Sequence, residues 1–270
     1  MRGLVIAAGL GRRLGELTEM SPKCLLKVGG ETIVERIIKE MSHLGINNLA
    51  LVRGYMGHMF NLKGVQYFEN PNFRENNILH SMMCAENFLV DCLTQREDLL
   101  ISYSDIVFDS ALIKKVTESR EPISLLCDTD WEQKYLGRSA HPKTEAELVL
   151  INKSNSAVKF GKFFGEQVLH PTELGWKQVE FIGLTRLTPD GIALLLDAFR
   201  SISMKLAPDE PFGRARTFQN AYLLDLFQFL VDSGHEVSVT LTTGNWFEID
   251  TPEDLQRANE FFSKRSLQQD

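Results

Sequence analysis

Short apolar runs alternate with amphipathic stretches through the first half of the chain. Residues 3–8, GLVIAA, are continuously apolar, which predicts a strand buried on both faces of a parallel sheet. In residues 31–45 the apolar side chains recur at helical spacing, and Gly45 stands at a natural C-terminal cap. Residues 47–54 and 64–70 read as further strands. This alternation predicts an α/β fold with a doubly wound, mostly parallel sheet.

The pattern continues to the end of the chain with one interruption. Residues 76–90 predict one amphipathic helix, and residues 97–108 predict a strand that breaks at Ser104-Asp105. Further strands are expected at 156–164, 179–188 and 236–243, and helices at 188–202, 219–234 and 251–262. Residues 128–150 are polar and lack a clear period, which favours a lid over a site. We therefore expect a single domain over residues 1–270, with a lid inserted at 128–150.

Composition narrows the classes of partner that the protein is expected to bind. The 270 residues carry 29 Lys and Arg against 36 Asp and Glu, a formal charge of −7, which argues against a nucleic-acid binder. No apolar run reaches the length of a membrane span, and residues 2–8 lack a signal-peptide pattern. The four cysteines show no metal or disulfide spacing and read as reduced thiols. A cytoplasmic protein is expected, with no membrane partner; a homo-oligomer is compatible with the sequence.

Basic residues gather in the loop after the first predicted strand. Gly9 and Gly11 let the backbone approach a ligand closely, and Arg13 and Lys23 follow them. A dinucleotide fingerprint would need a third glycine where Leu14 stands, and the Gly-Lys-Ser/Thr of a phosphate-binding loop is absent. Two cations beside a glycine turn suit a triphosphate that is split into pyrophosphate.

At this point the sequence resembles the nucleotidyltransferases that make sugar- and alcohol-nucleotides. The resemblance rests on the pattern Gly9-x-Gly11-x-Arg13-Leu14, on Ser21-Pro22-Lys23 and on Val28-Gly29-Gly30. Residues 103–108 (YSDIVF), 246–252 (WFEIDTP) and 75–77 (ENN) with Ser81 are similar to the cytidylyltransferase branch, which includes phosphocholine and 2-aminoethylphosphonate cytidylyltransferases. One departure is Tyr-Ser-Asp at 103–105, where Gly-Asp is commoner.

The resemblance implies a Rossmann-like nucleotidyltransferase fold, binding of CTP and a role for each motif residue. Asp105 and Asp250 would hold Mg²⁺ at the transferring phosphoryl group, and Arg13 and Lys23 would neutralise the departing pyrophosphate. The residues implied in nucleotide binding are Ala8, Gly9, Gly11, Asn77 and Ser81. Taken singly, each aspartate is equally compatible with a turn or a cap, and the asparagines with a helix cap.

The acceptor is expected to be a small phosphorylated or phosphonylated amino alcohol. Trp131 and Tyr135 could bind its ammonium group on their faces, with Arg138 for its anion; packing is the alternative for both rings. If they pack, Glu180 is the candidate for the amine. Competing functions are a hexose-1-phosphate uridylyl- or thymidylyltransferase, and a non-catalytic nucleotide-binding module.

Overall fold

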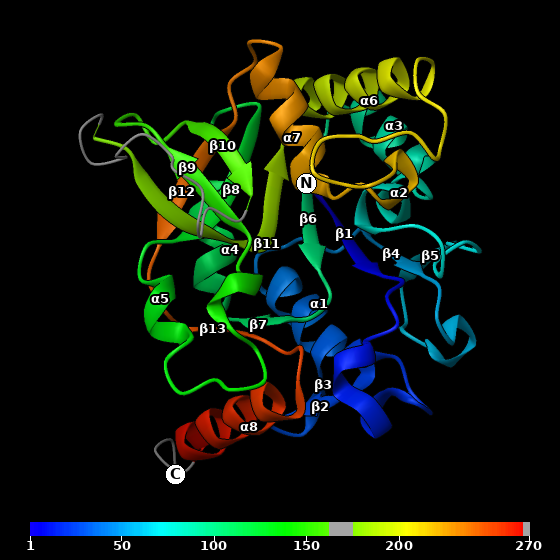
Figure 1. The fold of residues 1–270 in the computed structure, drawn as a ribbon. Coiled ribbons are helices and arrows are strands. Elements are labelled where there is room, and N and C mark those ends of the chain that lie inside the picture. The colour runs from blue at the N-terminus through cyan, green and yellow to red at the C-terminus, as the bar shows by residue number, and fades with distance from the viewer. Residues whose placement is uncertain (162–174, 267–270) are drawn as a thin grey trace.

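The computed structural model describes residues 1–161 and 175–266, which form a nine-stranded sheet with helices on both faces (Figure 1). The strands run in the order β10-β9-β11-β6-β1-β4-β5, and β8 joins β11 to β12. Their bounds are β1 (Arg2–Ala7), β4 (Leu49–Arg53), β5 (Val65–Glu69), β6 (Leu99–Tyr103), β8 (Ile123–Asp128), β9 (Leu148–Ile151), β10 (Ala157–Gly161), β11 (Lys177–Leu187) and β12 (Ser238–Thr242). Two small pairs are separate, β2 (Lys27–Val28) with β3 (Glu31–Thr32), and β7 (Ile106–Phe108) with β13 (Trp246–Glu248).

The helices divide between the two faces of the sheet. Their bounds are α1 (Ile33–His43), α2 (Ile78–Met83), α3 (Glu86–Thr94), α4 (Ser110–Thr117), α5 (Trp131–Lys134), α6 (Pro189–Ser203), α7 (Leu223–Asp232) and α8 (Pro252–Ser266). Leu4 and Ile6 of β1 pack in one core with α2, α3, α6 and α7, whereas Val5 and Ala7 pack in another with α1 and α4. Strands β5, β4, β1 and β6 are parallel. These observations confirm the doubly wound α/β prediction.

Local sequence signals explain where several helices begin. Thr32 and Glu35 form a capping box at α1, and the Thr188 side chain accepts from Gly191 N before Pro189 opens α6. The expected single helix over 76–90 is wrong: the chain turns at Cys84 and Ala85, so α2 and α3 each bury an apolar face in the same core.

Strand β11 creates the space for a ligand. Along one edge, Lys177–Glu180 pair with β9 and Leu184–Leu187 pair with β6, both antiparallel. Residues 181–183 lie between these two partners, and the register against β8 shifts in the same place. Gly183 has φ +83°, and a Cβ there would come within 2.9 Å of Tyr103 Cβ, so the bulge requires glycine.

The expected lid is partly regular structure. Residues 128–150 hold α5, the 3₁₀ turn Lys143–Glu145 and most of β9, so residues 148–150 belong to the sheet. The strand expected at 156–164 is β10 as far as Gly161, and its remaining residues lie outside the described residues. Within the described ranges, no helix has the length and apolar character needed to cross a membrane.

Candidate active site

A cavity of about 200 Å³ lies at the carboxyl end of β1, beside the opening loop. Its lining includes every residue expected to bind a nucleotide, namely Ala8, Gly9, Gly11, Asn77 and Ser81. Gly11 has φ +63°, and a Cβ there would lie 2.9 Å from Lys23 Cβ. Asn77 also caps α2, since its side chain accepts from Ile78 N. The loop therefore brings exposed backbone and Lys23 to one hollow, which suits an anionic ligand.

Four residues expected to be catalytic form one cluster. Asp105 follows β6, and Asp250 stands just before α8. Lys23 Nζ donates to Asp105 Oδ2 at 2.8 Å and also to Asp250 Oδ1. Arg13 donates from Nη2 to Asp250 Oδ2. The fold thus joins residues more than two hundred positions apart at the end of the sheet.

The side chains of Lys23 and Asp250 are largely buried in this cluster, whereas Asp105 is partly exposed and Arg13 is exposed. Burial opposes the charge of Lys23, but Asp105 and Asp250 outweigh it and raise the pKa of Lys23. Burial likewise opposes the charge of Asp250, but Lys23 and Arg13 lower the pKa of that carboxyl. Both shifts favour the charged forms of Lys23 and Asp250.

A larger cavity, of about 410 Å³, adjoins the first. Asn77, Tyr103 and Asp105 line both, so Asp105 stands at their junction. The acidic residues lining the larger cavity are Asp105, Glu145, Glu147, Glu180, Glu248 and Asp250, and the basic ones are Arg13 and Arg214. This balance favours a ligand with a cationic part, or a metal ion, beside its anionic part.

Glu180 lines the larger cavity from β11 and is 2% exposed. Its Oε1 accepts a hydrogen bond from the Tyr135 hydroxyl, whereas Oε2 is buried and has no hydrogen-bond partner within residues 1–161 and 175–266. Burial raises the pKa of Glu180 to about 8, although Tyr135 and Arg138 act in the opposite direction. A buried, unsatisfied carboxylate oxygen is costly, so this atom calls for a donor from a ligand.

Trp131, Tyr135 and Arg138 do not line the larger cavity. The two rings are 4% and 7% exposed and pack edge to face with each other beside Leu148 and Leu150. Arg138 is bound by Asp254 at 2.9 Å. The expectation that the two rings receive a ligand cation is therefore corrected in favour of packing, because neither ring face is open. Tyr135 contacts the site through its hydroxyl, which donates to Glu180, and through the edge-to-face contact of its ring with His141.

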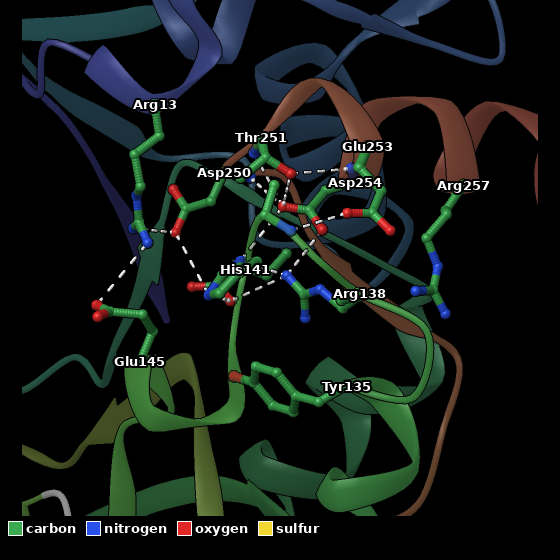
Figure 2. A network of polar contacts seen from close by, with 12 residues as sticks. Arg13, Tyr135, Arg138, His141, Glu145, Asp250, Thr251, Glu253, Asp254 and Arg257 are labelled. Carbon is green, nitrogen blue, oxygen red and sulfur yellow. Dashed lines mark hydrogen bonds and ion pairs between the residues drawn. The ribbon is translucent and has the colours of Figure 1, made fainter.

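Side chains of helix α8 contact the segment 136–141 and hold it in place (Figure 2). Arg257 donates to Leu136 O, Glu253 Oε2 accepts from the backbone of residues 139 and 140, and Asp254 contacts His141 Nδ1 at 3.3 Å. Asp254 also accepts from the backbone N–H groups of residues 250 and 251. One turn of α8 therefore positions both Asp250 and the segment 136–141.

Two sets of donor atoms could hold a metal ion. Lys23 Nζ touches both Asp105 and Asp250, so their carboxylates lie within reach of a single cation. Ligand atoms of His141, Glu248 and Asp250 lie within 4.8 Å of one another, with His141 Nε2 at 3.4 Å from Glu248 Oε2. Asp250 belongs to both sets.

Sequence reasoning missed Glu248 and Arg214. Glu248 lies two residues before Asp250 in the motif WFEIDTP, so strand alternation places both side chains on one face. Burial and the charges of Asp250 and Asp105 raise the pKa of Glu248. Arg214 lies in a loop with no motif, and no local signal could have assigned it to the cavity.

Comparison with known proteins agrees with this geometry. The family described as the MobA-like NTP transferase domain matches residues 3–154. CTP:phosphoglutamine cytidylyltransferase of Campylobacter jejuni is 25% identical over 261 residues, which cover 95% of this chain and 98% of that protein. 2-Aminoethylphosphonate cytidylyltransferase of Lancefieldella rimae is 27% identical over 164 residues, covering 59% of this chain and 60% of its own length.

A solved structure supports the fold. CTP:phosphocholine cytidylyltransferase from Streptococcus pneumoniae superposes with a TM-score of 0.69 at 17% identity, and the match covers 96% of this chain and 98% of that one. The Rossmann-like nucleotidyltransferase fold expected from the sequence is thereby confirmed.

Proposed function

The chain belongs to the family of MobA-like NTP transferase domains, and from this premise we propose that it transfers CMP from CTP to a small acceptor bearing a phosphate or phosphonate and an amine, releasing pyrophosphate. The observation that carries the proposal is the pair of cavities that meet at Asp105. The smaller one offers glycine backbone and Lys23, which suit a triphosphate. The larger one is rich in carboxylates, which suit an amine.

The reaction needs positioned charge more than a base. A phosphomonoester is largely dianionic at neutral pH, so the acceptor oxygen is already a nucleophile. The residues at the junction then orient this oxygen towards the α-phosphorus of the nucleotide. Arg13 and Lys23 bind the β- and γ-phosphates and stabilise the pyrophosphate as it leaves.

The Asp105–Asp250 pair fits Mg²⁺. Carboxylate oxygens are ligands that Mg²⁺ prefers, and Lys23 Nζ already bridges the two side chains as a single cation. When bound there, Mg²⁺ would supply positive charge at the transferring phosphoryl group. Lys23, once freed from the two aspartates, is available for the phosphates.

We assign the binding of the acceptor's amine to Glu180. Glu180 lines the larger cavity, and its buried Oε2 has no hydrogen-bond partner among the described residues, so an ammonium group that reached this oxygen would satisfy it. The six acidic residues of the lining, against two basic ones, support an amino-bearing acceptor over a hexose 1-phosphate, which carries no cation.

A pyrophosphate-release screen tests the function. CTP, UTP, ATP and GTP would each be combined with O-phosphoethanolamine, phosphocholine, 2-aminoethylphosphonate and glucose 1-phosphate, with and without Mg²⁺. We expect release with CTP, Mg²⁺ and an amino-bearing acceptor. Turnover only with UTP and glucose 1-phosphate would support the uridylyltransferase alternative, and nucleotide binding without any release would support the non-catalytic module.

A further inference from the structure

Arg214 gives the larger cavity a second positive charge, separate from the phosphate cluster. Arg13, the other basic residue of the lining, contacts Asp250. Arg214 comes from a different part of the chain, the loop before α7, and its Nε lies 3.5 Å from Asp225 Oδ1. The cavity therefore offers cations on two different elements, although its lining is mainly acidic.

The position of Arg214 is built into the fold. Gly213 has φ +58°, and a Cβ there would lie 2.8 Å from Asp225 Cβ. The Arg214 N–H donates to Asp225 Oδ1 at 3.0 Å, while Asp225 Oδ2 accepts from Tyr222 N. Asp225 is 2% exposed, so a buried carboxylate holds both the backbone and the base of this guanidinium. These contacts fix where the side chain leaves the loop.

The absence of a side chain at Gly161 leaves room for the Arg214 side chain. A Cβ on Gly161, at the end of β10, would lie 3.1 Å from Arg214 Cδ and 3.4 Å from Nη1. The Cζ atom of the Arg214 guanidinium lies 5.9 Å from the centroid of the Tyr222 ring. The Arg214 side chain is 38% exposed, and with Nε beside Asp225 its planar guanidinium keeps donors that match the two oxygens of a carboxylate.

We propose that Arg214 binds a carboxylate group of the acceptor, so that the acceptor is a phosphorylated or phosphonylated α-amino acid. This inference rests on the proposed function and adds a third contact to it. The phosphate or phosphonate lies at the Asp105 junction, the ammonium group at Glu180 and the carboxylate at Arg214. An acceptor with all three groups complements a lining that carries many carboxylates and two separate arginines.

Matched acceptors that differ only in the carboxylate test this assignment. O-Phosphoserine would be compared with O-phosphoethanolamine, and 2-amino-4-phosphonobutyrate with 3-aminopropylphosphonate, so that two chain lengths are sampled. With CTP, we expect kcat/KM to be at least about 10-fold higher for the carboxylated acceptor than for its decarboxylated partner in at least one pair. A difference of this size is what a charge-assisted hydrogen bond contributes.

Variants of Arg214 connect this preference to the residue. Arg214→Gln should remove the preference by lowering kcat/KM for the carboxylated acceptor at least about 10-fold, with the decarboxylated one within about twofold. Arg214→Lys keeps the charge but loses the paired donors, so it should keep part of the preference. Arg216→Gln is the matched control, since Arg216 is exposed in the same loop and lies outside the lining.

Several outcomes would overturn the inference. An equal loss for both members of a pair in Arg214→Gln would mean that Arg214 binds the shared phosphate. A wild-type preference for the decarboxylated acceptors, or none, would also refute it while leaving the proposed function intact. Absence of turnover with every nucleotide would instead refute the proposed function. Calorimetric titration of wild type and Arg214→Gln with O-phosphoserine and 2-amino-4-phosphonobutyrate would then decide, because unchanged affinities would refute the role of Arg214 as well.

Discussion

Glu180 should make binding of an amino-bearing acceptor depend on pH. Its carboxyl is almost fully buried, and burial raises its pKa to about 8. The Tyr135 hydroxyl and the Arg138 charge oppose this shift, whereas the charges of Asp128 and Glu147 add to it. The ammonium group of an acceptor pairs with the ionised carboxylate, so the proton on Glu180 must leave when the acceptor binds.

The size of the effect follows from this pKa. With a pKa of about 8, roughly one tenth of Glu180 is ionised at pH 7 and roughly one hundredth at pH 6. Apparent affinity scales with the competent fraction, so the KM of the acceptor should fall about 10-fold from pH 6 to pH 7 and level off above pH 8. At pH 7, binding should release close to one proton.

The assay needs a control for the phosphonate, which titrates in the same range. KM would be measured by pyrophosphate release from pH 6 to 9 with 3-aminopropylphosphonate and with 3-hydroxypropylphosphonate. The ratio of the two KM values isolates the amine. We expect this ratio to change with pH in the wild type and to be flat in Glu180→Gln. A flat ratio in the wild type, or an unchanged slope in the variant, would contradict the assignment of Glu180.

The same carboxyl predicts the pH dependence of stability. The folded-state pKa of Glu180, about 8, lies above the ordinary value of 4.5, so the folded protein keeps a proton that the unfolded chain releases. This contribution to the free energy of unfolding is complete below about pH 4.5. It is lost as pH rises towards 8, at up to about 1.4 kcal/mol per pH unit. Urea titrations should show a shallower decline in Glu180→Gln.

Other predictions concern the cluster and the packing residues. Asp105→Asn and Asp250→Asn should each lower kcat about 100-fold or more, because each removes charge facing the transferring phosphoryl group; near-normal turnover in a stopped assay would show that the site is misassigned. Lys23→Ala should lower kcat strongly. Lys27→Ala should leave kcat unchanged, because Lys27 is exposed. Equal losses of kcat in the two variants would indicate a diffuse basic patch instead. Trp131→Ala should reduce the free energy of unfolding by about 3–5 kcal/mol in urea titrations, with the acceptor KM unchanged if the protein stays folded, since the ring is buried.

The opening loop and the two aspartates could be predicted because their signals are local. Gly9 and Gly11 follow an apolar run, and Asp105 comes just after a strand of the sheet, which places its carboxylate at the sheet's edge. Asp250 precedes a Thr-Pro helix start, which marks it as an element end. The structure joins all of them at one edge, where Lys23 contacts both carboxylates.

The residues around the larger cavity could not be predicted in the same way, because tertiary contacts determine their positions. Trp131 and Tyr135 stand in a polar stretch, which suggested exposure, yet β9 supplies Leu148 and Leu150 to cover them. Arg214 is placed by a backbone hydrogen bond to Asp225, and its side chain passes Gly161, which is distant in sequence. Pairings of this kind leave no periodic pattern in a single sequence.

Asp254 connects Asp250 to the segment that holds Arg138 and His141. Its buried carboxylate accepts from the backbone at Asp250 and Thr251 and binds Arg138 at 2.9 Å and His141 at 3.3 Å. Burial opposes its charge, but the His141 and Arg138 contacts outweigh burial and lower the pKa of Asp254 to about 2. The pairing therefore persists throughout the neutral range. Because one ionised side chain caps α8 and contacts both the Asp250 backbone and residues 138 and 141, these contacts favour a fixed segment beside Asp250 over a lid that opens and closes.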